Sequence, residues 1–230
     1  MHLPELQITS LKITQIDGMW PQFRKQPAKL HLLYGHSGIF MLSLALGSAA
    51  QQTIAVIDGA MKFNSYTLSK IARMLGLSAS ALLKQTHVTR SFTAYQTEAA
   101  ITTKLPRFLA TSQCQIVIIL GLLDTYYDEQ VQAHECYQSL RRVLAELRFL
   151  VNKNIHVLIA DLEVASPPHG KENLFHLVKK AADIITVLEP YEKGFHLKEE
   201  RSNHLWDATT IRSHLLSTNS EKHGINFAEH

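Results

Sequence analysis

The sequence predicts an α/β fold in which a mostly parallel, twisted sheet carries helices on both faces. Two observations lead to this prediction: short apolar runs alternate with amphipathic stretches, and no internal repeat interrupts that order. A chain of 230 residues with ordinary globular composition suits one large domain better than two small ones. We therefore expect an N-terminal segment (1–27), a core domain (28–212) and a polar, mobile tail (213–230).

The first elements are a strand, a helix and a second strand. Residues 30–34 form an apolar run that ends at Gly35, and residues 40–50 are rich in Leu and Ala, which favours a helix. Residues 53–57 form a β-branched run, typical of a buried strand, which ends at Asp58. These three elements begin the alternation expected of a parallel sheet.

The next elements form a helical pair, a short strand and a long helix. Residues 66–75 place apolar side chains on one helical face, and Gly76 is suited to the positive φ that often follows a helix. Ser78 is suited to cap the following helix. Residues 87–89 read as a short strand, and residues 96–109 as a helix.

The remaining elements repeat the alternation and close it with a hairpin. Residues 115–120 give the clearest buried strand, and residues 134–151 the clearest amphipathic helix. The later elements are a strand at 156–160, a helix at 171–182, a strand at 184–188 and a hairpin strand at 195–199.

Composition limits the classes of function. The formal net charge of +3 permits contact with nucleic acid without requiring it. No apolar run is long enough to cross a membrane, and no basic segment with a following apolar stretch opens the chain, so we expect a cytoplasmic protein without membrane contact. Cys114 and Cys136 are expected to be free thiols, and the 13 histidines show no spacing typical of a metal site.

The turn after the first strand has the position of a phosphate-binding loop. In the motif G-x-x-x-x-G-K-[ST], backbone amides hold phosphates, the lysine neutralises them and the hydroxyl binds magnesium. Here the segment reads Gly35-His36-Ser37-Gly38, so two glycines stand at a shorter spacing. Ile39 and Phe40 follow Gly38, where the motif has its lysine and its hydroxyl residue.

The segments that follow carry a resemblance to a known family. Val56-Ile57-Asp58-Gly59-Ala60-Met61-Lys62-Phe63 ends the second strand, Leu75-Gly76-Leu77 ends a helix, and Arg90-Ser91-Phe92 precedes another helix. Together they resemble the RecA/RadA recombinases, especially the archaeal and eukaryotic branch and its paralogues, which carry I-D-T-E-G-x-F and A-R-A-F segments in this order. The resemblance spans roughly residues 28–200, and it implies a RecA-like sheet closed by a C-terminal hairpin.

Departures from the family's pattern fall on its catalytic positions. Ala60 stands where the resemblance places the glutamate that positions the attacking water. The central strand ends without its family aspartate, and the first acid, Asp124, comes three residues after Gly121. We therefore expect no catalytic residue, no cofactor and no metal site. The nucleotide-binding remnant comprises Gly35, His36, Ser37, Gly38, Asp58 and Asp124.

Two loops correspond to those that face DNA in the family. In residues 123–135, Tyr126 and Tyr127 suggest a protein interface, with a partly buried aromatic pair as the alternative. In residues 162–173, His169 and Lys171 are candidate DNA contacts, with a rigid turn as the alternative.

Basic residues outside these loops offer further candidate surfaces. On the helix 134–151, Arg141, Arg142 and Arg148 form either a basic stripe that binds DNA or an acidic partner, or a solvated charged face. Lys62, Lys70 and Arg73 extend a basic face near the second strand.

The sequence thus predicts a catalytically inactive RecA/RadA-like paralogue, a binding or assembly subunit in DNA repair or recombination. Its expected partners are another protein, such as a RecA-like ATPase, and single-stranded DNA. Two alternatives stay open. One is a divergent NTPase that binds ATP and magnesium through Gly35, Gly38 and Asp124. The other is a RecA-fold interaction subunit that does not bind DNA.

Overall fold

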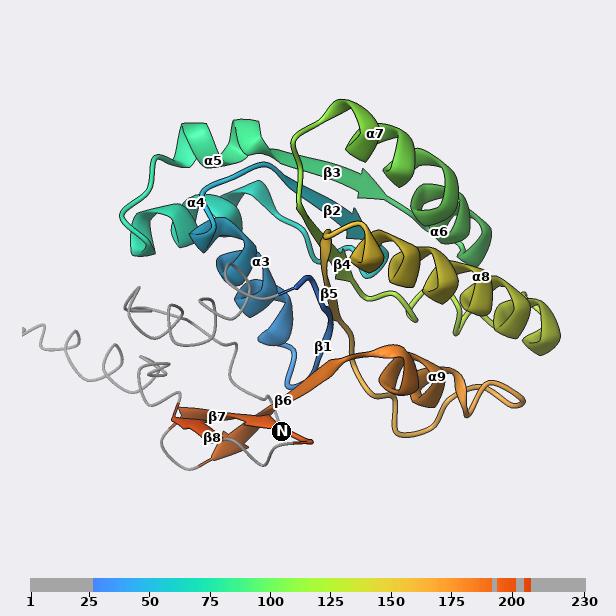
Figure 1. Ribbon diagram of the computed structural model, residues 1–230. Helices are drawn as coiled ribbons and strands as arrows, with labels where there is room; N and C mark the ends of the chain where they lie inside the picture. The colour runs from blue at the N-terminus through green and yellow to red at the C-terminus, as the bar shows by residue number, and fades with distance from the viewer. Residues whose placement is uncertain (1–26, 192–193, 202–204, 208–230) are drawn as a thin grey trace, which may run out of the picture.

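One sheet of eight strands organises the protein, seen here in a computed structural model that describes residues 27–191, 194–201 and 205–207 (Figure 1). The strands are β1 (Leu30–Gly35), β2 (Ile54–Asp58), β3 (Thr86–Arg90), β4 (Ile116–Leu120), β5 (His156–Ala160), β6 (Ile184–Tyr191), β7 (Gly194–Glu199) and β8 (Leu205–Asp207). Their order across the sheet is β3-β2-β4-β5-β1-β6-β7-β8. The first six pair in parallel, whereas β7 and β8 pair antiparallel.

Helices cover both faces of this sheet. They are α3 (Ile39–Ala49), α4 (Ser65–Met74), α5 (Ala79–Gln85), α6 (Ala94–Ala99), the π-helix η1 (Ala100–Lys104), α7 (Leu105–Thr111), α8 (Ala133–Asn152) and α9 (Leu174–Ala181). Figure 1 shows α3, α4 and α5 on one side of the strands, with α6, α7, α8 and α9 on the other. The predicted α/β class with a mostly parallel sheet is confirmed.

The helices create two apolar cores because successive strand side chains point to opposite faces. Val117 and Ile119 of β4 pack into the core beneath α6, α8 and α9. Ile116, Ile118 and Leu120 of the same strand pack into the core beneath α3. Since both faces of β4 are covered, its sequence is a continuous apolar run, which is why the sequence identified this strand most clearly.

Local signals set several helix ends, and two of them, Gly76 and Ser78, were predicted from the sequence. The side chain of Asn64 accepts a hydrogen bond from the Tyr66 amide at the start of α4 (2.8 Å). Ser78 caps α5 by accepting from the Ala81 amide, at 3.3 Å. Gly76 has a φ of +68°, as expected for a residue directly after a helix.

Three parts of the prediction required correction. The helix expected at 96–109 begins at Ala94 and contains the π-helical turn η1, which ends two residues before Pro106. Proline cannot donate a backbone hydrogen bond and its ring crowds the preceding turn, so a wider turn accommodates it. Helix α9 begins at Leu174 and not at Lys171, and the short strand β8 was not predicted. The strand β7 was predicted. The predicted tail (213–230) and all but the last residue of the predicted N-terminal segment (1–27) lie outside the described residues.

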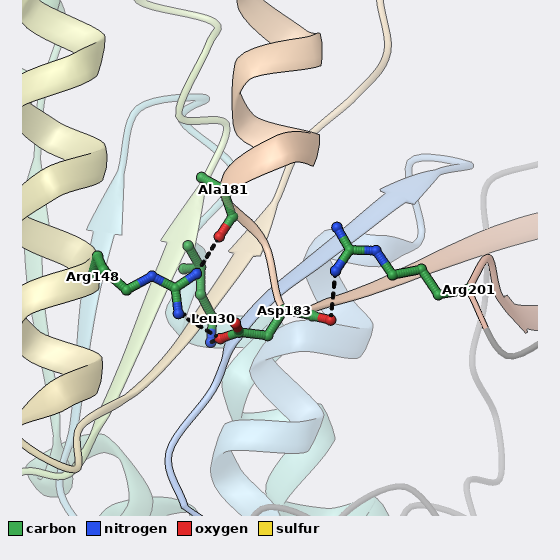
Figure 2. A network of polar contacts seen from close by, with 5 residues as sticks. All are labelled: Leu30, Arg148, Ala181, Asp183 and Arg201. Atoms are coloured by element: carbon green, nitrogen blue, oxygen red, sulfur yellow. Dashed lines mark hydrogen bonds and ion pairs between the residues drawn. The ribbon is translucent and has the colours of Figure 1, made fainter.

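A polar cluster ties α8 to the amino-terminal ends of β1 and β6 (Figure 2). The carboxylate of Asp183 accepts the Leu30 amide at 2.8 Å and the Arg148 guanidinium at 2.9 Å. Arg148 also donates to the Ala181 carbonyl, and Arg201 donates to the Asp183 carbonyl at 3.2 Å. Arg148 therefore has a structural role here and is not part of a free basic stripe on α8.

Within the described residues, no helix combines the length and apolar character that crossing a membrane requires. Cys114 and Cys136 are buried free thiols, as predicted.

Candidate functional site

The turn from β1 into α3 contains four residues of the predicted nucleotide-binding remnant, Gly35 to Gly38. Only three residues separate the end of β1 from the first residue of α3. Gly35 has a φ of +108°, and a Cβ atom there would lie 2.5 Å from the carbonyl oxygen of Leu188 on β6. The turn is thus short and closely packed against the neighbouring strand, which leaves little backbone to surround a phosphate.

Two backbone amides of this turn have acceptors inside the protein. The His36 amide donates to the Leu188 carbonyl at 2.9 Å, and the Gly38 amide donates to Nδ1 of the His36 imidazole at 3.2 Å. Partial burial lowers the pKa of His36, which favours the neutral ring that such an acceptor requires. An amide that donates internally is not available to an anion, so the His36 side chain closes the turn from within.

The residues after the turn supply neither a cation nor a hydroxyl. Ile39 is fully buried and Phe40 is 5% exposed, and both pack into the core beneath α3. A positive charge nevertheless comes near from another element, because the Lys62 ammonium lies 5.8 Å from the centroid of the Phe40 ring.

Asp58 at the end of β2 is fully buried and organises the loop that follows it. Its two carboxylate oxygens accept the amides of Lys62 at 2.9 Å and Phe63 at 3.1 Å. The guanidinium of Arg90, at the end of β3, lies 3.7 Å from the same carboxylate. Asp58 was predicted as part of the nucleotide-binding remnant, but these contacts give it a structural role in holding its own loop.

The loop after β2 also packs closely against the end of β4. The amides of Gly59 and Ala60 both donate to the Leu120 carbonyl, at 2.9 and 3.1 Å. Gly121 has a φ of +62°, and a Cβ atom there would lie 2.2 Å from the Cβ of Ala60. A small residue at position 60 therefore fits a close contact between two strand ends, at the position where the resemblance places a glutamate.

Asp124 lies in the loop after β4, and its side chain is exposed. Its pKa is raised, chiefly because surrounding protein displaces water from the carboxylate; Lys62 opposes this shift and Asp58 adds to it. The structure thus brings Asp124, Asp58 and Lys62 into one electrostatic neighbourhood. Among the described residues, no group of three or more His, Cys, Asp and Glu side chains is placed to hold a metal ion.

Asp161 is a buried carboxylate that was not among the predicted site residues. It follows β5 directly, is fully buried, and accepts the amides of Leu123 at 2.8 Å and Leu162 at 2.9 Å. Burial raises its pKa to about 8, against the opposing effect of the Leu123 hydrogen bond. The sequence signal that could have identified Asp161 is an acidic residue at the carboxyl end of an apolar strand, which Asp58 also shows.

Of the two candidate DNA contacts in the loop 162–173, Lys171 is buried and His169 is exposed. Lys171 is 2% exposed, and its ammonium donates to the carbonyl of Tyr126 at 3.0 Å and to that of Asp128. A lysine held in this way cannot reach a phosphate, and we withdraw it as a candidate contact. His169 is exposed and lies 3.7 Å from the carboxylate of Glu172.

Arg141 and Arg142 are both exposed on α8. Arg142 forms a two-point contact with the Glu98 carboxylate, at 2.5 and 3.0 Å, and this contact lowers the pKa of Glu98. Since Arg142 is paired within the protein and Arg148 belongs to the Asp183 cluster, the predicted stripe on α8 retains only Arg141 without such a partner among the described residues.

The tyrosine pair proposed as an interface lies mostly inside the protein. Tyr126 is fully buried, and its hydroxyl is 3.0 Å from that of Ser139. Burial raises the pKa of Tyr126 to about 12 and also raises that of Tyr127, whose hydroxyl is buried. We withdraw Tyr126 as an interface residue, because a side chain without exposed surface cannot contact a partner.

Comparison with known proteins gives no further identification: no protein-family model matches the chain, and no curated protein matches its sequence. The site therefore has to be interpreted from its own geometry. That geometry combines a closed first turn, a loop fixed by Asp58, and exposed basic and aromatic side chains around the ends of β2 and β3.

Proposed function

We propose that this protein is a catalytically inactive RecA/RadA-like paralogue that acts as a binding or assembly subunit in DNA repair or recombination. The observation that carries the proposal is the closed first turn, in which the Gly38 amide donates to the His36 imidazole. The order of strands and helices, ended by the antiparallel pair β6–β7, is compatible with the sheet that the sequence resemblance implies.

Phosphoryl transfer depends almost wholly on positioning and on charge neutralisation. Removing a single group that stabilises the transition state typically costs about 10²–10³ in rate. Here the positions that the family uses for a cation, a hydroxyl and a water-positioning acid hold Ile39, Phe40 and Ala60. Several losses of this size leave no reason for turnover, which favours a subunit that works by binding.

Exposed apolar side chains support a role in binding. Large exposed apolar residues on a folded protein often mark surfaces that partners cover. The described residues include several with more than a third of their surface exposed: Met61, Tyr66, Leu83, Val88, Phe92, Tyr95, Phe149 and Val164. The partner that suits the proposal is an intact RecA-like ATPase, which would supply the hydrolysis that this chain lacks.

A calorimetric titration with ATP and magnesium tests the inactive half of this proposal, together with a phosphate-release assay on the same protein. We expect no saturable heat and no release above the rate of buffer alone. Tight, magnesium-dependent binding, or hydrolysis abolished by Asp124→Ala, would overturn the proposal.

One observation favours the alternative that this chain is a divergent NTPase: the Lys62 ammonium lies beside Phe40 and near Asp124. If Lys62 replaced the missing lysine, Lys62→Ala would abolish nucleotide binding, whereas Lys84→Ala on α5 would not. We expect neither variant to differ from the parent, because none of the three binds nucleotide.

The assembly half is tested by size-exclusion chromatography of this chain mixed with a RecA-like ATPase from the same cells. Co-elution with an altered ATPase rate supports it. Separate elution from every such ATPase of the cell would leave the inactive chain without the assembly role and contradict this half.

A further inference from the structure

Charge is distributed unevenly along the chain. Between Asp58 and Glu98 the sequence has no acidic residue, yet it contains five basic ones: Lys62, Lys70, Arg73, Lys84 and Arg90. The segment covers the loop after β2, the helices α4 and α5, the strand β3 and the start of α6. The elements at the edge of the sheet formed by β3 therefore contribute five basic residues between Asp58 and Glu98.

This positive charge is exposed and largely uncompensated. All five side chains are exposed, and only Arg90 lies within 4 Å of a carboxylate among the described residues, at 3.7 Å from buried Asp58. Asp124 is the acid that faces Lys62, and it lies beyond ion-pair distance. Exposed cations of one sign on adjacent elements attract a polyanion, with a strength that falls as salt rises.

Four of these cations lie on connected elements. The side chain of Arg90 donates to the Phe63 carbonyl at 3.2 Å, in the same loop that carries Lys62. That loop leads directly into α4, where Tyr66, Lys70 and Arg73 are spaced by four and three residues, which places them on one helical face. From Tyr66 to Arg73 this face extends about 10 Å along the helix.

Exposed aromatic rings accompany the cations. Tyr66 and Phe92 are each 61% exposed, and the Lys70 ammonium lies 4.7 Å from the centroid of the Tyr66 ring. Phe92 follows Arg90 by two residues. Cations bind the sugar–phosphate backbone, and exposed aromatic rings stack on unpaired bases; this combination is typical of proteins that bind single strands.

We propose that Lys62, Tyr66, Lys70, Arg73, Arg90 and Phe92 form a surface that binds single-stranded DNA, named here the basic surface. The inference rests on the proposed function and gives it a location different from the loops expected from the sequence, where Lys171 is buried. An acidic protein segment would engage the cations but would leave the two exposed rings unexplained. For this reason the observations favour a ligand with unstacked bases.

The test measures fluorescence anisotropy of a labelled deoxythymidine oligonucleotide with the full chain at low salt. Lys62→Glu/Lys70→Glu should weaken binding by about tenfold or more, since each reversal removes an attraction and adds a repulsion. The matched control is Lys153→Glu/Lys180→Glu, which reverses one exposed lysine directly after α8 and one on α9 and should change affinity less than about twofold.

A second pair of variants separates stacking from charge. Tyr66→Ala should weaken binding about tenfold, whereas Tyr66→Phe should keep the parent affinity, because a phenyl ring presents the same stacking face. Tyr66 is an exposed residue in the first turn of α4, so neither change disturbs a core. Circular dichroism of all variants confirms that the fold is retained.

Three outcomes would overturn the inference: equal losses for both double variants, equal affinities of Tyr66→Ala and Tyr66→Phe, or loss only in an Arg141→Glu variant. Competition by polyglutamate as effective as that by unlabelled oligonucleotide would also overturn it, in favour of an acidic protein partner. The nucleotide titration described above uses no DNA. Failure of the basic surface is therefore distinguishable from failure of the inactive-subunit proposal.

Discussion

At the residue scale, burial determines which charged groups are available for chemistry. Asp58 is the last residue of β2 and Asp161 directly follows β5, and the carboxylate oxygens of both accept hydrogen bonds from backbone amides of adjacent loops. Lys171 has the opposite role, because its ammonium donates hydrogen bonds to the backbone carbonyls of Tyr126 and Asp128. Asp161 and Lys171 thus act as internal partners for backbone that secondary structure leaves unpaired.

The pKa of Asp161 predicts how stability depends on pH. The folded protein keeps this proton up to about pH 8, whereas the unfolded chain releases it near the ordinary Asp value of 3.8, so stability falls as pH rises between these values. His31 acts in the opposite direction below its ordinary value of 6.5, because burial lowers its pKa to about 3. Between pH 6.5 and 8 we therefore expect Asp161 to dominate this pair, lowering stability by up to about 1.4 kcal/mol per pH unit.

Urea denaturation at several pH values across that window measures this slope, with Asp161→Asn as the comparison. The amide cannot titrate, so the variant should show a flatter dependence. It should also be less stable at pH 6.5, because the amide nitrogen cannot accept the second backbone N–H. An unchanged slope in the variant would contradict the assignment to Asp161.

Gly35 and Gly76 provide a matched test of backbone constraint. Both have positive φ, but only at Gly35 would a Cβ atom meet backbone, at 2.5 Å from the Leu188 carbonyl; nothing lies within 4 Å at Gly76. Gly76→Ala should cost about 1–2 kcal/mol of unfolding free energy, from the backbone conformation alone. Gly35→Ala should cost on the order of 3 kcal/mol, because a steric clash is added. Equal losses in urea denaturation would show that the Gly35 turn is free to move away from β6.

At the element scale, polar contacts fix how helices meet strand ends. The Arg148–Asp183 pair joins α8 to the amino-terminal ends of β1 and β6, and the Asp183 carboxylate also accepts the Leu30 amide. The pair is half exposed, with 40% and 27% of the two side chains accessible, so water weakens its direct attraction.

We expect a double-mutant cycle of Arg148→Ala and Asp183→Ala to give a coupling energy of about 1 kcal/mol or less. Asp183→Ala alone should cost more than Arg148→Ala, because it also leaves the Leu30 amide without its side-chain acceptor. Unfolding free energies of the parent and the three variants decide this. Equal single-variant costs would indicate that the Leu30 contact contributes nothing.

Most elements could be predicted from the sequence because their signals are local. Apolar runs, caps such as Ser78 and the glycine at position 76 act within a few residues. The π turn and the late start of α9 depend instead on Pro106 and on the buried Lys171, whose effects involve neighbouring turns and a distant loop. Lysine is rarely buried, so a surface position was the natural expectation for Lys171.

At the scale of the whole molecule, the order of the strands across the sheet could not be predicted from the sequence. Strands buried on both faces, such as β4, show no alternation that would identify their neighbours. The turn Gly35 to Gly38 does lie at the end of β1, as the sequence predicts. The hydrogen bond from the Gly38 amide to His36 joins residues only two apart, but it depends on how the His36 side chain is oriented, which no sequence pattern shows. The uneven distribution of charge, by contrast, can be read directly from the sequence.

Salt dependence should report the number of phosphates that the basic surface contacts. Four cations engaged with a single strand predict a slope of about −3 in a plot of log affinity against log salt. Lys62→Glu/Lys70→Glu should reduce the magnitude of this slope by about 1.4. Anisotropy titrations over a series of salt concentrations measure both values, and a slope near zero would exclude phosphate contact as the source of affinity.

The closed turn after β1 has a consequence for how the proposed subunit would respond to its surroundings. A ligand that binds only the native state raises the melting temperature with its concentration. Because the Gly38 amide finds its acceptor in His36, the native turn is complete without such a ligand. The melting temperature should then not depend on the concentrations of ATP and ADP. The chain would keep the same conformation while a neighbouring ATPase alternated between its ATP-bound and ADP-bound states.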